Sequence, residues 1–170
     1  MLRSPLIGIQ VRAVARLARA ALPGMIRRGG GSIINIASLL ALSGTLPPTP
    51  LPYRATYAGA KAFILAFTQA LVGELIGTGV RLQVCLPGRV GTEFHTLQGI
   101  DTSVLPPAMT ADDVVTASLA ALTHDEVVCV PALADPTLFD RLTVAQVKVF
   151  RDAVIQTALA ERYRSPAQTE

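Results

Sequence analysis

Tyr57 and Lys61 are the two side chains whose types and spacing most clearly allow chemistry. They stand four residues apart in the run Tyr57-Ala58-Gly59-Ala60-Lys61, so on a helix they share one face. An ammonium beside a phenol favours the phenolate and lowers the phenol pKa from its ordinary value of about 10. Such a phenol can give and take protons at neutral pH. Because this spacing alone is common on protein surfaces, the surrounding elements decide what it means.

A helix between two strands carries this pair. The β-branched run from Ser32 to Ala37 has the length and composition of a fully buried strand. Apolar residues at helical spacing predict a helix from about Thr56 to Ile76, and Val80 to Leu86 predicts a second buried strand. A strand, a helix and a strand in this order form a right-handed βαβ unit with parallel strands. The sequence therefore predicts an α/β fold.

The rest of the chain supplies flanking helices and turns, and we expect one domain over residues 1–170. Four prolines predict a loop over residues 39–54. The remaining expected elements are a helix from Pro5 to Arg28, a glycine turn at 29–31, a helix start at Thr110 continued by Val114 to Leu122, a third strand from Glu126 to Val130, and a closing helix or two from Leu142 to Tyr163.

Two loops follow the carboxyl ends of the first two strands, where α/β sheets bind their ligands. The first loop begins with Ser38, and the second reads Pro87-Gly88-Arg89-Val90-Gly91-Thr92. The helix that carries Tyr57 starts at the same end of the sheet. The sequence therefore predicts a site formed by these three segments.

Three motifs together carry a family resemblance: GSIINIAS from Gly31 to Ser38, YxxxK from Tyr57 to Lys61, and PGxxxT from Pro87 to Thr92. In this order and on these elements they resemble the second, catalytic half of a short-chain dehydrogenase/reductase. The resemblance covers nearly the whole chain and is most specific from Gly29 to Phe94. It implies a Rossmann-like parallel sheet with flanking helices and an NAD(P)-dependent oxidoreductase that acts on a small-molecule carbonyl or alcohol.

The resemblance also implies catalytic roles. Tyr57 would be the acid-base group, Lys61 would lower its pKa and hold the nicotinamide ribose, and Ser38 would hydrogen-bond the substrate carbonyl. The gap from Ser38 to Tyr57 is longer than the family usually shows, which leaves Ser43 as an alternative. Gln10 stands where the family's first-helix catalytic asparagine aligns, and its longer amide is a candidate for ordering a water.

NAD or NADP is the cofactor that the resemblance implies. The loop of Pro87 and Gly88 would line its site, and the backbone of Val90 and the hydroxyl of Thr92 would contact the nicotinamide amide. No Gly-rich strand-turn-helix motif precedes the first helix, and the glycines at 29–31 precede a strand instead of following one. We therefore expect the family's N-terminal βα units, with the pyrophosphate cradle, to be missing and one edge of the first strand to be free.

Several function classes are disfavoured by composition. The net charge is only +3, and the bases Arg12, Arg16 and Arg19 are interpreted as a solvated helix face instead of a nucleic-acid site or a transit peptide. Arg, Gln, Lys or Pro interrupts every apolar run before it reaches the roughly 18 residues of a membrane span. The protein is thus expected to be cytoplasmic, without membrane or nucleic-acid partners.

Metal binding and a disulfide are also disfavoured. His95 and His124 have no cysteine or histidine at ligand spacing. Cys85 and Cys129 lie in short β-branched runs, which favours buried thiols in a reducing compartment.

One alternative function stays open beside the enzyme. A non-catalytic remnant could act as an association module through the helices of residues 5–28 and 56–76, which commonly form the dimer interface in the family. A homo-oligomer is expected in either case.

Overall fold

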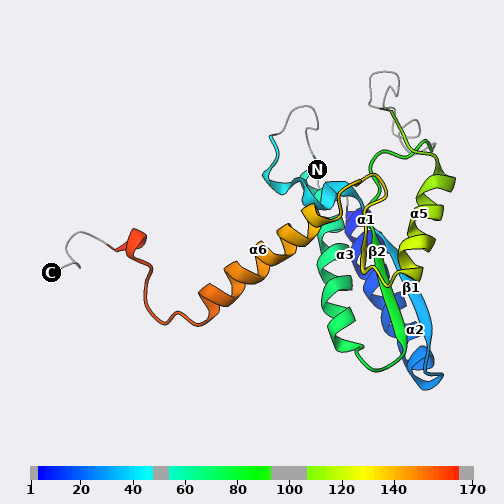
Figure 1. The fold of residues 1–170 in the computed structure, drawn as a ribbon, viewed down its shortest axis with the longest axis horizontal. Coiled ribbons are helices and arrows are strands. Elements are labelled where there is room, and N and C mark those ends of the chain that lie inside the picture. The colour runs from blue at the N-terminus through cyan, green and yellow to red at the C-terminus, as the bar shows by residue number, and fades with distance from the viewer. Residues whose placement is uncertain (1–3, 48–53, 93–106, 165–170) are drawn as a thin grey trace. The chain divides into compact units, whose positions relative to one another are not determined.

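The structure is a computed structural model that describes residues 4–47, 54–92 and 107–164 of the chain (Figure 1). The chain divides into two compact units, Met1–Ala132 and Leu133–Glu170. The single domain expected for the whole chain stays a prediction.

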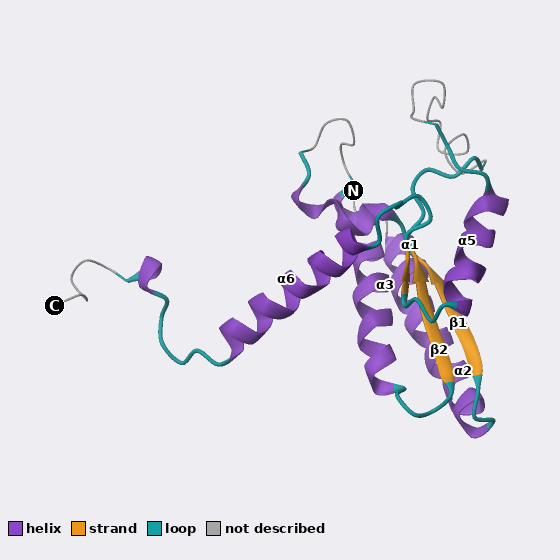
Figure 2. Ribbon diagram, viewed as in Figure 1, coloured by secondary structure: helices purple, strands orange, loops and turns teal. Residues whose placement is uncertain are grey.

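Three parallel strands form the sheet of the first unit, in the order β1-β2-β3 (Figure 2). The strands are β1 (Gly31–Ile36), β2 (Val80–Cys85) and β3 (Val128–Cys129). Strands β1 and β2 pair in register along their whole length, and Cys85 of β2 stands beside Cys129 of β3. The predicted parallel α/β fold of Rossmann-like type is thereby confirmed.

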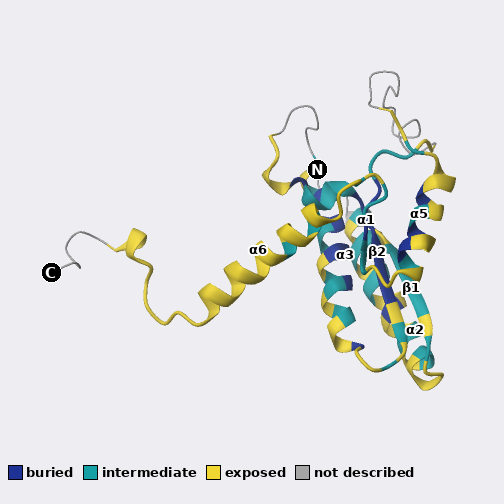
Figure 3. Cartoon of the chain, in the orientation of Figure 1, coloured by how far each residue is buried: buried dark blue, intermediate teal, exposed yellow. Residues whose placement is uncertain are grey.

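The expected full burial of the first strand is wrong. The middle of β1 is only half-buried and Ile36 is 53% exposed, whereas β2 is fully buried from Leu82 to Cys85 (Figure 3). Within the described residues β2 lies between two strands, but β1 is paired on one side only.

Helices flank the sheet as predicted, with small differences in their bounds. The first helical stretch consists of α1 (Ser4–Ile7), a π-helical segment η1 (Gly8–Ala13) and α2 (Val14–Arg27), and Pro23 lies inside α2 without ending it. The crossover helix α3 (Ala55–Glu74) contacts β1, β2 and η1. Helix α5 (Ala111–Thr123) contacts β2 and β3, and Thr110 caps it by accepting a 3.0 Å hydrogen bond from the Asp113 N–H.

Two polar pairs, one of them fully buried, fix the helices to the strands. The Ser118 hydroxyl of α5 donates to Oε1 of Gln83 on β2 over 2.6 Å, and Nε2 of Gln83 donates to the Ser118 carbonyl over 3.0 Å. On the other side of the βαβ unit, Nδ2 of Asn35 on β1 donates to Oγ1 of Thr68 on α3 over 2.9 Å. Because buried polar groups must be paired, these contacts define how each helix sits on its strand.

Glycines make the turn at the amino ends of β1 and β2. Gly29 and Gly79 both have positive φ, at 67° and 75°, and a Cβ on Gly79 would stand 2.2 Å from the Gly29 carbonyl oxygen. The run from Gly29 to Gly31 therefore serves a close backbone contact at the end of the sheet opposite to the predicted site.

The second unit contains α6 (Thr137–Val154) and a short 3-10 turn η4 (Glu161–Tyr163). A closing helix or two were predicted from Leu142 to Tyr163; α6 begins five residues earlier than predicted, and η4 ends at Tyr163. The structure gives the reason for the earlier start, because the Asp135 carboxylate accepts hydrogen bonds from the N–H and hydroxyl of Thr137 over 3.0 and 2.7 Å. The third strand is likewise shorter than predicted.

Helix α3 is, among the described residues, the one helix long and apolar enough to cross a membrane, with 33% of its most apolar window buried. Our sequence criterion of an uninterrupted apolar run missed it. The helix contacts β1 and β2 and buries Lys61, which is the pattern of a core helix that covers a parallel sheet.

Candidate active site

The two loops that follow β1 and β2 are hydrogen-bonded to each other at the carboxyl end of the sheet. The N–H of Ala37 donates to the Cys85 carbonyl over 2.8 Å, and the N–H of Leu39 donates to the Pro87 carbonyl over 3.0 Å. These contacts extend the strand pairing beyond β1 and β2. The predicted juxtaposition of the Ser38 loop and the Pro87 loop is therefore present.

Ser38 lies between β1 and a 3-10 helix, η2 (Leu39–Thr45), which it caps. Its backbone is extended and its hydroxyl oxygen accepts a 3.2 Å hydrogen bond from the Leu40 N–H. The residue is 9% exposed. With one oxygen lone pair used by Leu40, the hydroxyl proton is available for a neighbour.

Tyr57 is that neighbour. It lies in the first turn of α3, half-buried, and forms a side-chain hydrogen bond with Ser38. Burial raises the pKa of the Tyr57 phenol, and the hydrogen bond with Ser38 opposes this change. The longer gap between the two residues has thus not separated them.

Lys61 stands one turn further along α3. It is 7% exposed, and its Nζ donates a 3.0 Å hydrogen bond to the Ile36 carbonyl at the end of β1. The same nitrogen lies 5.6 Å from the centroid of the Tyr57 ring, and burial lowers the Lys61 pKa. We expected Lys61 to lower the Tyr57 pKa, but the net direction is the opposite, because the burial of the phenol outweighs the hydrogen bond with Ser38.

Ser43, the alternative to Ser38, has a structural role. Its buried hydroxyl donates to the Leu40 carbonyl over 2.8 Å and accepts from Nε of Arg54 over 3.2 Å. Arg54 also donates to the carbonyls of Ser43, Leu46 and Pro47. One guanidinium therefore holds the segment that follows Ser38.

Sequence reasoning missed Arg54 and took residues 39–54 as a plain loop. One signal could have identified it: Arg54 is the single charged residue between Arg28 and Lys61. The prolines correctly excluded an α-helix, but the 3-10 helix η2 forms ahead of them.

The loop after β2 is braced by a second segment. Val90 forms a parallel bridge with Met109, in which the Gly91 N–H donates to the Met109 carbonyl over 2.8 Å. The Thr92 N–H turns back to the Val90 carbonyl over 2.9 Å. A Cβ added to Gly88 would lie 3.5 Å from Cδ1 of Leu39, which is an ordinary van der Waals distance. These residues follow β2, and their loop is hydrogen-bonded to the Ser38 loop that follows β1.

Two further predicted positions have different outcomes. Gln10 is half-buried on η1, and η1 contacts α3, but its catalytic role stays a prediction. His95 lies outside the described residues, and within the described part of the chain no three metal-ligating side chains gather. His124 is exposed at the end of α5, with Nδ1 3.9 Å from a Glu126 carboxylate oxygen.

Two curated relatives that match part of the chain are named as reductases. It is 37% identical over 97 residues to the ketoacyl reductase HetN of Nostoc sp., which covers 57% of this chain and 31% of that protein. It is 38% identical over 93 residues to the very-long-chain 3-oxoacyl-CoA reductase of Mus musculus, which covers 55% of this chain and 28% of that protein. The chain thus spans about a third of the length of these two relatives.

A solved structure extends the similarity to nearly all of the chain. The short-chain dehydrogenase from Sphingobium yanoikuyae in complex with NADPH superimposes with a TM-score of 0.83 at 32% identity, covering 93% of this chain and 59% of that one. Residues 4–101, more than half of the chain, match the short chain dehydrogenase family. The chain belongs to the short-chain dehydrogenase family.

Proposed function

We propose that this chain carries the catalytic groups of an NAD(P)-dependent oxidoreductase that interconverts a carbonyl and an alcohol, and that it corresponds to the catalytic half of the family's fold. One observation carries the proposal: Ser38 and Tyr57 are hydrogen-bonded at the carboxyl ends of β1 and β2, with Lys61 buried on the same helix face. That end of a parallel sheet is where such folds bind ligands. Two relatives are named as reductases of oxo or keto acyl groups.

The residues present fit the nicotinamide end of the cofactor. Lys61 has three N–H donors, of which one is used by the Ile36 carbonyl, so others can reach ribose hydroxyls. Val90 and Thr92, in the loop beginning at Pro87 and Gly88, offer backbone and hydroxyl groups to the carboxamide. When bound, a nicotinamide cofactor supplies hydride chemistry.

The pyrophosphate end has no matching cradle in the described residues. The glycine run 29–31 lies at the amino end of β1 and is engaged with Gly79. Pyrophosphate usually binds a glycine-rich turn at a helix N-terminus after a strand. This chain's own residues therefore support the chemistry at the carbonyl more directly than the binding of a whole dinucleotide.

Tyr57 and Ser38 would act together on the substrate oxygen. In reduction the Tyr57 O–H donates its proton to the carbonyl oxygen, and in oxidation the phenolate takes the proton back. A raised phenol pKa keeps Tyr57 protonated at neutral pH, which suits the reductive direction. Ser38, held by the Leu40 N–H, would turn its one hydroxyl proton from Tyr57 to the same substrate oxygen when substrate binds.

Lys61 and Gln10 would support the proton transfer. The Lys61 ammonium stabilises the negative charge that remains on Tyr57 after its proton has left. Gln10, on the segment η1 that contacts α3, would order a water that connects this pair to solvent.

The first experiment is titration of the purified chain with NADPH and NADH, followed by cofactor fluorescence, together with turnover of a 3-oxoacyl thioester and a simple ketone. Micromolar binding would mean that this chain holds the dinucleotide without such a cradle, and turnover is then expected to fall roughly 10²–10⁴-fold in Tyr57→Phe, the range for loss of an acid-base group. Tyr163→Phe, at an exposed tyrosine of η4, is the matched control. Unchanged turnover in Tyr57→Phe, or no cofactor binding by the folded chain, would overturn the proposal.

An association module is the second candidate. It is favoured by two apolar side chains on the first helical stretch, Ile9 at 66% and Leu17 at 70% exposure. Ile9 lies in the π-helical segment η1 and Leu17 in α2. A stable dimer that binds neither cofactor would favour this function over the enzyme.

A further inference from the structure

Met109 is hydrogen-bonded to the loop that follows β2. Its N–H donates to the Arg89 carbonyl over 3.0 Å, and its own carbonyl accepts from the Gly91 N–H over 2.8 Å. Val90 lies between these two residues and is the bridge partner of Met109. The backbone of Met109 therefore bonds the loop on both sides of Val90.

These two bonds set the direction of the Val90 backbone. In a parallel bridge one residue bonds the two neighbours of its partner, so the N–H and C=O of the partner itself point the other way. The Val90 carbonyl accepts from the Thr92 N–H over 2.9 Å, whereas the Val90 N–H has no acceptor within residues 4–47, 54–92 and 107–164. One backbone donor is therefore available to a ligand at the carboxyl end of the sheet.

The side chain of Met109 joins the same loop to the core. Met109 is half-buried, although Pro107, Ala108 and Thr110 around it are exposed. Met109 and Val90 both pack against one buried cluster, whose members come from β2, α5 and β3: Cys85, Val114, Ala121 and Cys129. A flexible thioether is suited to filling an irregular gap beside such a cluster. The packing of this side chain thus determines where the backbone of Met109 lies.

The loop is hydrogen-bonded to a different segment at its start and at Val90. At its start the Pro87 carbonyl accepts from the Leu39 N–H of the Ser38 loop. The residues that flank Val90 bond Met109 instead. A ligand that accepts from the Val90 N–H binds best when this group is already held in place, because ordering a loop on binding costs affinity.

We propose that Met109 is a positioning residue for the nicotinamide end of the cofactor. Packed on the core, it holds the Val90 N–H in a direction from which the carboxamide can accept a hydrogen bond. The inference rests on the proposed function, in which the backbone of Val90 contacts the carboxamide. Met109 acts on the cofactor through Val90 and takes no part in the proton transfer.

Met109→Ala tests the role without any cofactor, because it shortens the side chain and keeps the backbone. Amide hydrogen exchange by NMR on the cofactor-free chain reads the Gly91 N–H, which donates to Met109. We expect this amide to exchange roughly tenfold faster in Met109→Ala, since the packing loses the equivalent of a few partly buried methylene groups. Met109→Leu conserves the volume and should restore the rate of the parent.

NADPH titration and steady-state kinetics of the same variants test the consequence for the cofactor. Met109→Ala should bind NADPH about tenfold more weakly, by the same loss of packing. Its kcat on the 3-oxoacyl thioester at saturating NADPH should stay within about twofold of the parent, because Tyr57 and Lys61 are unchanged. A loss in affinity without a loss in kcat is what a positioning residue predicts, and Met109→Leu should again resemble the parent.

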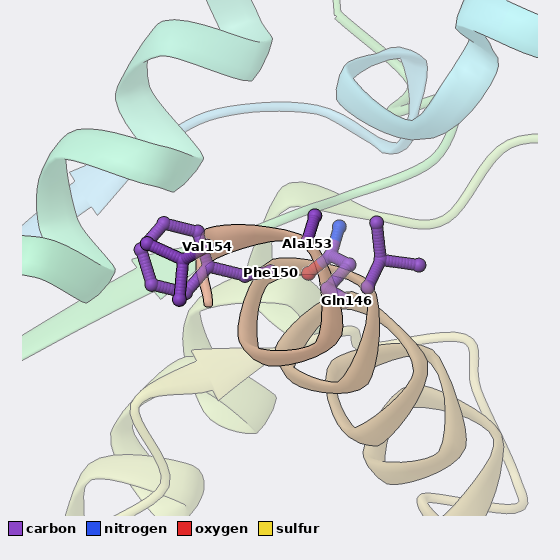
Figure 4. Close-up of a pocket in the computed structure, with 5 residues that line it drawn as sticks. Gln146, Phe150, Ala153 and Val154 are labelled. Atoms are coloured by element: carbon purple, nitrogen blue, oxygen red, sulfur yellow. The ribbon is translucent and has the colours of Figure 1, made fainter. Parts of the chain in front are cut away.

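Two controls separate this role from a general loss of stability. Val114 is 9% exposed and belongs to the same cluster, but its N–H bonds the Thr110 carbonyl at the start of α5. Val114→Ala should lower the urea midpoint while the Gly91 exchange rate and the NADPH affinity stay near those of the parent. Phe150→Ala removes the largest side chain from the hollow on α6 (Figure 4) and should change neither quantity.

Each contrary result identifies the proposal that fails. If the Gly91 amide of Met109→Ala exchanged as slowly as in the parent, the role of Met109 would be wrong. It would also be wrong if Val114→Ala weakened NADPH binding as much as Met109→Ala does. If the parent chain bound neither NADPH nor NADH, the proposed function would fail, and the role of Met109 toward the cofactor would fail with it.

Discussion

Nζ of Lys61 donates a 3.0 Å hydrogen bond to the carbonyl oxygen of Ile36. This contact joins the helix that carries Tyr57 to the last residue of β1. It also gives a buried ammonium its partner, although burial still lowers the Lys61 pKa. Lys61 therefore has a structural role in the fold that does not depend on a bound cofactor.

Lys61→Met keeps the length of the side chain but removes its charge and donors. We expect it to destabilise the fold by no more than about 1–3 kcal/mol, since the Ile36 carbonyl loses its partner while the cost of burying a charge disappears. Turnover should fall much more than stability. Lys61→Arg should not restore turnover, because a planar guanidinium does not fit a site built for a compact ammonium.

Chemical denaturation and steady-state kinetics on the same preparations check this prediction. Lys148→Met, at an exposed lysine of α6, is the control and should change neither quantity. If Lys61→Met lost stability but kept its turnover, Lys61 would be a structural residue alone.

Local patterns in the sequence predicted the parts of the fold and site that depend on local spacing. Tyr57 and Lys61 share a face because a spacing of four residues fixes this on any helix. The order strand, helix, strand likewise fixed the parallel pairing of β1 and β2. Ser38 lies near Tyr57 because Ser38 follows the carboxyl end of β1 and Tyr57 lies in the first turn of α3, at the same end of the sheet.

Other features depend on partners that have no sequence signal. The Ile36 carbonyl that holds Lys61 is a backbone group, which every residue possesses. The direction of the Tyr57 pKa depends on how deeply the phenol is buried, and the exposure of β1 depends on which strands flank it. The early start of α6 came from the Asp135 side chain two residues ahead of Thr137, which apolar periodicity does not register.

Arg54 should matter for activity although it lies outside the predicted catalytic set. Arg54→Met removes the guanidinium that bonds the Ser43 hydroxyl and several carbonyls of the segment after Ser38. We expect a loss of about 1–3 kcal/mol in the free energy of unfolding and a lower kcat, because the Ser38 hydroxyl loses its fixed position. Arg54→Lys should rescue little, since one ammonium cannot reproduce the fork of donors.

Urea denaturation measures the loss in the free energy of unfolding, and steady-state kinetics measure the fall in kcat. The control is Arg81→Met, because Arg81 is exposed and lies 3.9 Å from the Asp125 carboxylate, a surface pair worth at most about 1 kcal/mol. Equal stability losses in the Arg54 and Arg81 variants would contradict the assigned role.

Two glycines should respond to alanine in opposite directions. Gly79→Ala places a Cβ 2.2 Å from the Gly29 carbonyl oxygen at a φ of +75°, so we expect destabilisation of at least about 1–3 kcal/mol. Gly73→Ala has nothing within 4 Å of the new Cβ and lies in α3, so it should stabilise by up to about 1 kcal/mol. Urea midpoints of the two variants, measured side by side, check both signs.

Cys85 should make the protein less stable in alkali. Burial and the neighbouring Cys129 raise the pKa of the Cys85 thiol from its ordinary 9.0 to about 12. Above pH 9.0 the unfolded thiol gives up a proton that the folded thiol keeps, so the folded state binds more protons and its stability falls as pH rises. The slope for this one thiol reaches at most about 1.4 kcal/mol per pH unit, and it ends near pH 12, where the folded thiol also ionises.

The measurement is the urea midpoint as a function of pH, in the parent chain and in Cys85→Ala. The variant should be less stable at neutral pH, because it leaves a cavity in the sheet, but its stability should fall less steeply above pH 9.0. Tyr57, whose pKa is also raised by burial, contributes a slope of the same sign in both proteins and cancels in the comparison. Parallel curves for the two proteins would show that the alkaline loss comes from groups other than this thiol.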